Sequence, residues 1–216
     1  MSLIWDDNID IKIENNKIYV AGYTKGCSGT CYDMVIYRFN IDGVIDLSFN
    51  GKGYSVQANA AGGSSDDKAI SLSFDINGNI YVVGCSINAS LNCDVTIWKF
   101  LPDGNLDLSF NGKGYVTYGN LAGGNGYDAG IHIYIDLSGN IYVISNSDSN
   151  DPGCSGDCRA IVILKLLSDG SIDTSFGGGD GKVEFIDTSQ SFNFCEAKSM
   201  TITANSKILI TGYIYD

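Results

Sequence analysis

The feature that most restricts the fold is a segment that recurs along the chain. The pattern Asp-Gly-x-x-Asp-x-Ser-Phe begins at Asp42, Asp103 and Asp169, so successive copies start 61 and 66 residues apart. A second element, typified by Asn-Ile-Tyr-Val, recurs at residues 17–22, 79–84, 140–144 and 207–212. The chain therefore contains three full units and the first part of a fourth. A fixed long period of this kind is the sequence signature of repeat architectures.

Each unit contains four short segments with the pattern of β-strands. Residues 70–76 alternate apolar and polar side chains, which is the two-residue period of a strand. The Asn77-Gly78 pair that follows is typical of a tight hairpin turn. Three more segments complete the unit, namely the Ile-Tyr-Val element, a third apolar segment and a short segment such as 115–118. No window has the sustained spacing of an amphipathic helix, so the sequence predicts an all-β fold.

Four strands repeated at a fixed interval predict the blades of a β-propeller. We expect β-propeller-like blades of four antiparallel strands, namely three complete blades and a two-strand partial blade. They form a single domain over residues 1–216, with repeats at approximately 9–57, 69–118, 129–187 and 197–214. A β-sandwich or barrel is the alternative, although neither requires near-identical turns at a fixed interval.

The repeated residues have structural interpretations. Glycine after the first aspartate supplies positive φ at a tight turn, and the second aspartate can accept the backbone N–H two residues on. The phenylalanine is expected to wedge between blades. Arg38, Lys99 and Lys165 share one repeat position, and we expect them to pair with nearby repeat aspartates or to extend past the third strand, rather than to form a ligand-binding ring. The second aspartates and the phenylalanines are Asp46, Asp107, Asp173, Phe49, Phe110 and Phe176.

The segment from Asp103 to Gly114 resembles the signature D-G-x-L-D-x-S-F-G-x-x-G of the delta-60 repeat family, a bacterial β-propeller repeat. The resemblance extends over nearly the whole chain as successive copies. Asn50 and Asn111 stand where that family often has glycine, and asparagine tolerates positive φ better than most residues. The resemblance implies a propeller in a cell-surface or secreted setting, and it implies no catalytic residues.

Six of the seven cysteines lie between the second and third strands of a unit, in pairs close in sequence. We predict three local disulfides, which indicate an oxidising compartment. A zinc site is the alternative, but the two Cys-x3-Cys pairs belong to blades that are not neighbours. Cys195 has no evident partner. The predicted pairs are Cys27–Cys31, Cys85–Cys93 and Cys154–Cys158.

Charge and hydropathy restrict the location and the partners. Thirteen basic and 25 acidic residues give a net charge of −12, which disfavours nucleic acid as a partner. No apolar run is long enough for a transmembrane helix. The first seven residues lack the pattern of a signal peptide. We therefore expect an extracellular, periplasmic or cell-surface protein whose export signal is not present in this chain.

Two groups of residues are candidates for ligand binding. Tyr23, Tyr32 and Asp33 lie near the rim formed by the cysteine-containing loops, where a glycan or a protein could bind. His132, Tyr134 and Asp136 alternate along one predicted strand. This trio suggests acid–base chemistry, although a buried histidine near the propeller axis is the simpler interpretation.

An inserted loop in the third unit concentrates oxygen ligands. Asp148, Asp151 and Asp157 could hold Ca²⁺ there, but the order of ligands is not that of an EF-hand and an ordinary solvated loop is favoured. We expect no other cofactor and no other metal.

Three and a half units leave the repeat open. The first strand carries Asp10, Lys12 and Glu14 on one face, so we expect this polar face to be exposed or to meet something polar. The chain is then a fragment, an open arc or half of an assembly, and we expect it to self-associate or to bind a partner chain. The sequence thus favours a non-enzymatic extracellular module for adhesion, scaffolding, or protein or glycan binding. The alternative is a carbohydrate-active hydrolase or lyase with a site at the channel mouth.

Overall fold

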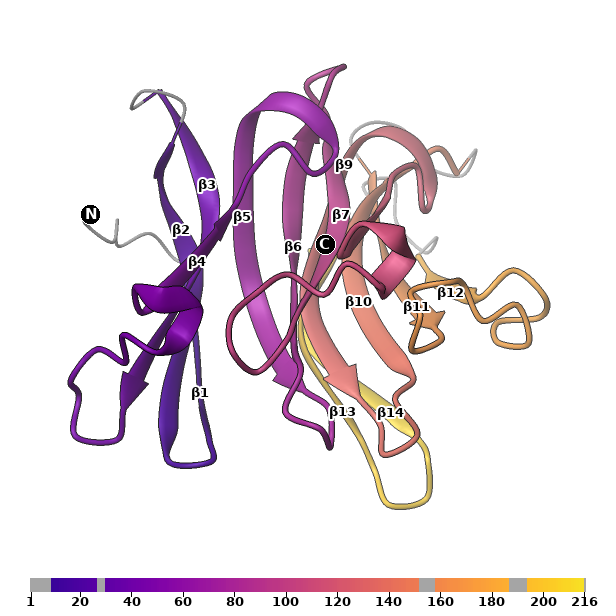
Figure 1. Ribbon diagram of the computed structural model, residues 1–216. Coiled ribbons are helices and arrows are strands. Elements are labelled where there is room, and N and C mark those ends of the chain that lie inside the picture. The colour runs from indigo at the N-terminus through magenta and orange to yellow at the C-terminus, as the bar shows by residue number, and fades with distance from the viewer. Residues whose placement is uncertain (1–8, 27–29, 152–157, 187–193, 216) are drawn as a thin grey trace.

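The computed structural model describes residues 9–26, 30–151, 158–186 and 194–215 (Figure 1). Strands dominate these residues, and two single-turn 3-10 helices at Phe49–Gly51 and Phe110–Gly112 are the helical elements among them. The strands are β1 (Asp10–Glu14), β2 (Lys17–Gly26), β3 (Cys31–Asn40), β4 (Tyr54–Gln57), β5 (Gly62–Phe74), β6 (Ile80–Asn88), β7 (Cys93–Phe100), β8 (Tyr115–Tyr118), β9 (Gly123–Ile135), β10 (Ile141–Ser149), β11 (Cys158–Leu166), β12 (Lys182–Phe185), β13 (Phe194–Ile202) and β14 (Ile208–Tyr215).

The strands form successive antiparallel sheets, which we call blades. Blade one has the order β1-β2-β3-β4, and blade two has the order β5-β6-β7-β8. In blade three, β9 lies along β10, and β10, β11 and β12 pair in that order. The antiparallel pair β13–β14 forms partial blade four, which a single parallel pairing, Arg159 with Phe194, joins to β11. The predicted fold class is confirmed, and these blades do not close into a ring (Figure 1).

The blades pack side by side through their apolar faces. The innermost strand of blade two, β5, contacts β1, β2 and β3 of blade one, and β9 contacts blade two in the same way. Between blades one and two, Tyr19, Ile36 and Phe49 pack with Leu72 and Trp98. The predicted phenylalanine wedge is thus present at Phe49, and Phe110 occupies the same position between blades two and three.

Each wedge phenylalanine contacts the Asp-Gly turn of the next blade. Gly104 has a φ of +91°, and a Cβ there would lie 2.8 Å from the Phe49 ring. The carbonyl of Asp103 accepts the N–H of Asn50 at 2.6 Å. Asn50 itself has a φ of +48°, as expected for asparagine in place of glycine. Glycine at the turn is therefore required both by its backbone conformation and by the close approach of the neighbouring ring.

The repeated cation and the second aspartate form an ion pair in every complete blade, as predicted. The distances are 2.9 Å for Arg38–Asp46, 3.0 Å for Lys99–Asp107 and 2.7 Å for Lys165–Asp173. Each aspartate also accepts the backbone N–H of the serine two residues later. This arrangement links the third strand of each blade to the Asp-x-Ser-Phe segment that follows it.

We predict that the ion pair in blade three makes stability depend on pH below 4. Hydrogen bonds from Lys165 and Ser175 lower the pKa of Asp173 from 3.8 to about 2. A lowered pKa in the folded state contributes stability above pH 3.8, and this contribution is lost as the pH falls toward 2. The Asp173→Asn variant should have a lower Tm at pH 7 and a smaller loss of Tm between pH 4 and 2. Asp42→Asn, in an exposed turn, is the control, and parallel Tm curves for wild type and Asp173→Asn would contradict the prediction.

The polar face of β1 was expected to be exposed or to meet polar groups, and at Asp10 it meets polar groups of blade two. The Asp10 carboxylate accepts the Ser71 hydroxyl at 3.0 Å and the Leu72 N–H at 2.9 Å, so this face points toward blade two. Ile11 and Ile13, on the apolar face, are instead 59% and 64% exposed. The equivalent positions explain this arrangement: Asp10, Ser71, His132 and Ser199 line one common hollow, whereas Leu72 and Ile133, which are equivalent to Ile11, pack on the preceding blade.

Candidate functional site

One residue from each innermost strand lies at the same repeat position around the axis. These residues, Asp10, Ser71, His132 and Ser199, line a hollow of about 540 Å³ together with Lys12 and Lys198. Burial lowers the pKa of His132, and the nearby Lys12 lowers it further. The imidazole is therefore biased toward its neutral form, and its Nδ1 atom has no hydrogen-bond partner. We call this site the axial hollow.

Tyr134 and Asp136 do not line the axial hollow. They line a separate hollow with Tyr142 and Phe176, and the Tyr134 ring lies 6.4 Å from the Tyr142 ring. The Asp136 carboxylate accepts the N–H groups of Ser138 and Asn140 and the Asn140 amide, so it holds the hairpin turn. The structure therefore places His132 in one site and the other two residues of the predicted trio in another.

The predicted rim residues of blade one do come together. The Tyr23 and Tyr32 rings pack edge to face at 5.1 Å, and Lys68 Nζ lies 5.2 and 5.1 Å from their centroids. Asp33 is half-buried, burial raises the pKa of its carboxyl, and its Oδ1 atom lacks a hydrogen-bond partner. Lys68 also pairs with Asp66 at 3.1 Å, so β5 of the next blade completes this cluster.

A polar hollow of about 480 Å³ lies beside the β6–β7 loop, which is one of the predicted cysteine-containing rim loops, but none of its lining residues was among the predicted site residues. The Asn88 side chain shapes the loop because it accepts the N–H groups of Ser90 and Asn92 and donates to Asp94. Burial raises the pKa of Asp94. We call this site the asparagine hollow; it is lined by Asn88, Ser90, Asn92, Asp94, Gly119, Asn120 and Asn125.

The calcium candidates are only partly within the described residues, because Asp157 lies outside them. The Asp148 carboxylate accepts the Tyr127 N–H at 2.7 Å and lies 3.6 Å from the Arg159 guanidinium. The N–H of Asp151 donates to the Ser149 hydroxyl. Over the described part of the chain, no group of three or more His, Cys, Asp or Glu side chains is placed to hold a metal ion.

The Cys85–Cys93 disulfide, which joins β6 and β7, is confirmed. Cys31 and Cys158 are also disulfide-bonded, and their predicted partners, Cys27 and Cys154, lie outside the described residues. Cys195 is a buried free thiol.

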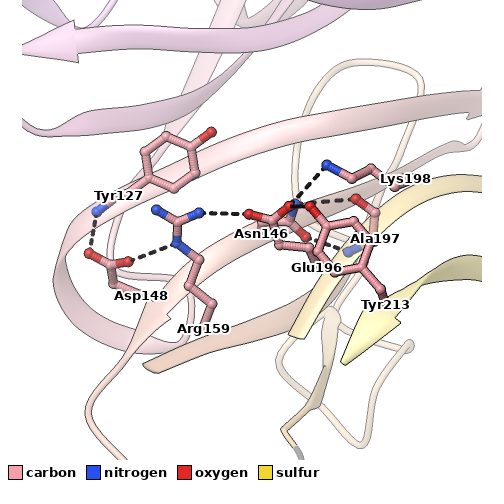
Figure 2. A network of polar contacts seen from close by, with 8 residues as sticks. All are labelled: Tyr127, Asn146, Asp148, Arg159, Glu196, Ala197, Lys198 and Tyr213. Carbon is pink, nitrogen blue, oxygen red and sulfur yellow. Dashed lines mark hydrogen bonds and ion pairs between the residues drawn. The ribbon is translucent and has the colours of Figure 1, made fainter. Parts of the chain in front are cut away.

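A polar network connects partial blade four to blade three (Figure 2). The sequence did not predict this network. The Arg159 guanidinium lies between Asp148 and Glu196, bonds the Glu196 carboxylate at 2.9 Å and stacks 4.4 Å from the centre of the Tyr127 ring. Glu196 also accepts the Tyr213 hydroxyl and pairs with Lys198. The network therefore connects β9, β10 and β11 with β13 and β14.

The Asn146 side chain adds a second connection between these blades. Its amide donates to the Ala197 carbonyl at 3.2 Å, and its oxygen accepts the Ala197 N–H at 2.8 Å. All of these groups are buried, so the pair fixes the position of β13 along β10. The short hairpin β13–β14 is thus held in place by side chains as well as by apolar contacts.

Both end blades expose apolar side chains. At blade one, Ile11, Ile13, Ile18 and Val20 form what we call the blade-one face, and the last two are half-buried. At the other end, an apolar groove of about 620 Å³ lies between β14 and the outer strands of blade three. We call it the β14 groove; it is lined by Ile161, Ile163, Val183, Phe185, Ile208, Ile210, Gly212, Tyr213 and Ile214.

The stacked four-stranded sheets define the class as an open β-propeller, and comparison with family models agrees. The family described as beta-propeller repeat matches residues 54–92. The beta-propeller described as a domain of unknown function (DUF5122) matches residues 14–49 and 138–176. These matches support the resemblance to bacterial β-propeller repeats.

Among solved structures, a fucose lectin from Kordia zhangzhouensis in complex with methyl-fucoside is similar to this chain. It is 13% identical, with a TM-score of 0.41, and the match covers 74% of this chain and 92% of the lectin. No curated protein matches the sequence. Among the described residues, no helix is both long and apolar enough to cross a membrane.

Proposed function

We propose that this chain is a non-enzymatic β-propeller module that serves as a scaffold or adhesion unit outside the cell. Its end blades bind protein partners, and a second copy of the chain is the first of these. The disulfide between Cys85 and Cys93 supports an oxidising location.

The observation that carries this proposal is a comparison of equivalent repeat positions. Leu72 of blade two and Ile133 of blade three are 0% and 2% exposed, because each packs on the preceding blade. Ile11 occupies the same position in blade one and is 59% exposed. The apolar repeat position that is buried at two blade contacts is therefore exposed in blade one. Large exposed apolar surfaces commonly mark interfaces.

We predict that a charge on the blade-one face prevents self-association. Wild type should show concentration-dependent association in sedimentation velocity, and Ile13→Lys should weaken the association constant at least tenfold. A buried lysine without a partner strongly disfavours a dry interface. Ile76→Lys is the matched control, since Ile76 is 73% exposed in a hairpin turn away from this face.

A wild-type chain that remains monomeric at several hundred micromolar contradicts the proposal. Equal effects of Ile13→Lys and Ile76→Lys also contradict it, because the association would then not depend on the blade-one face.

Glycan binding at the rim is a second candidate function, and the asparagine hollow favours it. The lining consists of side chains that donate and accept hydrogen bonds, which suits the hydroxyl groups of a sugar. Tyr23, Tyr32 and Asp33 form a further polar and aromatic cluster in blade one. The proposal concerns neutral sugars, because the carboxylates at both places repel anions.

We predict that neutral methyl glycosides bind the asparagine hollow. In saturation-transfer NMR with a panel of methyl hexosides, the double variant Ser90→Ala/Asn125→Ala should reduce the transfer signal at least fivefold. Asn77→Ala, at an exposed hairpin turn remote from this hollow, should leave the signal unchanged. Absence of transfer from the whole panel, or an equal signal from all three proteins, would exclude this candidate.

For the alternative enzymatic function, a carbohydrate-active hydrolase or lyase, the hydrolase form generally uses two carboxyl groups that flank one site. The axial hollow offers one carboxylate, Asp10, within its described lining, and Ser71 and the Leu72 N–H already bond it. This geometry supports binding over hydrolysis.

A further inference from the structure

We propose that the β14 groove binds an extended β-strand that has the apolar pattern of the third strand in this repeat. The proposal concerns the opposite end of the molecule from the blade-one face. It therefore does not depend on whether that face binds a second copy.

The pairing of the complete blades defines the missing partner of β14. The second strand of each blade pairs with a third strand in one register, in which Val20 faces Tyr37, Val82 faces Trp98 and Val143 faces Leu164. Ile210 is the equivalent position in β14. Within the described residues, β14 pairs with β13 alone. An acceptor edge with a known register is thus present in the fourth blade.

The side chains of β12 beside this edge are equivalent to side chains of β8 that the next blade covers. Val116 in β8 is equivalent to Val183 in β12, since they face Ile97 and Ile163 respectively. Val116 is 8% exposed because blade three covers it, whereas Val183 is 41% exposed. Phe185, two residues further along β12, is 53% exposed. The part of blade three that remains uncovered is therefore the part that a third strand would cover.

The equivalent third strands show which side chains the groove accepts. Trp98 and Phe100 of β7 are fully buried against blade one, and Leu164 and Leu166 of β11 are buried against blade two. These residues alternate along their strands, as one face of a strand requires. The occupant is accordingly a segment with bulky apolar residues at alternate positions, and its backbone adds to the edge of β14.

Side-chain contacts hold the acceptor strands in place without a bound strand. The Arg159 network and the Asn146–Ala197 pair hold β13 and β14 against blade three. Binding then orders only the incoming segment, which lowers the entropic cost of association.

The test uses a peptide with the sequence of residues 94–101, Asp-Val-Thr-Ile-Trp-Lys-Phe-Leu, labelled at its N-terminus. Fluorescence anisotropy should show saturable binding to the full chain, and hydrogen exchange should slow at the amides of 208–214. Phe185→Asp should weaken the Kd at least tenfold. Leu137→Asp, at a position 85% exposed in a distant turn, should leave the Kd unchanged.

A control peptide with serine in place of both aromatic residues should bind at least tenfold more weakly. Absence of binding, equal affinity for the two peptides, or binding without protection of β14 would overturn the proposal. Ile13→Lys should bind the peptide as tightly as wild type, so failure of the blade-one interface and failure of this site are distinguishable.

Discussion

In the described residues, the sheets carry large apolar side chains on both faces. A sheet therefore exposes one apolar face for each neighbouring sheet that it lacks. The blades satisfy this constraint by packing against each other, and the phenylalanine wedges lie at these contacts. The wedge also fixes the corner geometry, since the glycine of the next Asp-Gly turn lies directly on the ring. Blade-to-blade burial is the main source of stability in such repeats, and the ion pairs and turns position the surfaces that are buried.

The repeat made the fold predictable from the sequence. Three sequence features indicate β-propeller blades: glycine and asparagine at the turns, apolar residues that alternate along the strands, and the regular spacing of Asp42, Asp103 and Asp169. The ion pairs were predictable because Lys99 and Asp107 lie close in sequence and recur together. The disulfide between Cys85 and Cys93 was predictable for the same reason.

Features that depend on contacts between blades were not predictable. The charges of β1 left open whether its polar face is exposed or meets polar groups, because the sequence pattern does not show which face of an innermost strand points to the neighbouring blade. Alternation placed His132 and Asp136 on one face, yet Asp136 lies at the end of the strand and is engaged by a turn. Arg159 joins Asp148 to Glu196, which is 37 residues further along the chain, and no local pattern signals that contact.

The same constraint accounts for both proposed interaction surfaces. The blade-one face presents side chains that blades two and three bury, and the β14 groove presents the surface that a third strand covers in each complete blade. Each surface is thus a copy of an internal contact of this molecule. The predicted rim residues and the asparagine hollow lie apart from these contacts, so ligand binding there would be compatible with assembly.

The most direct measurement of the central claim is the free energy of unfolding of Phe110→Ala, compared with Leu108→Ala, by urea denaturation. The two residues belong to one repeat motif, but Phe110 is buried between blades and Leu108 is 65% exposed. If burial between blades stabilises the fold, Phe110→Ala should lose about 3–5 kcal/mol, whereas Leu108→Ala should lose less than about 0.5 kcal/mol. Equal losses for the two variants would contradict the account.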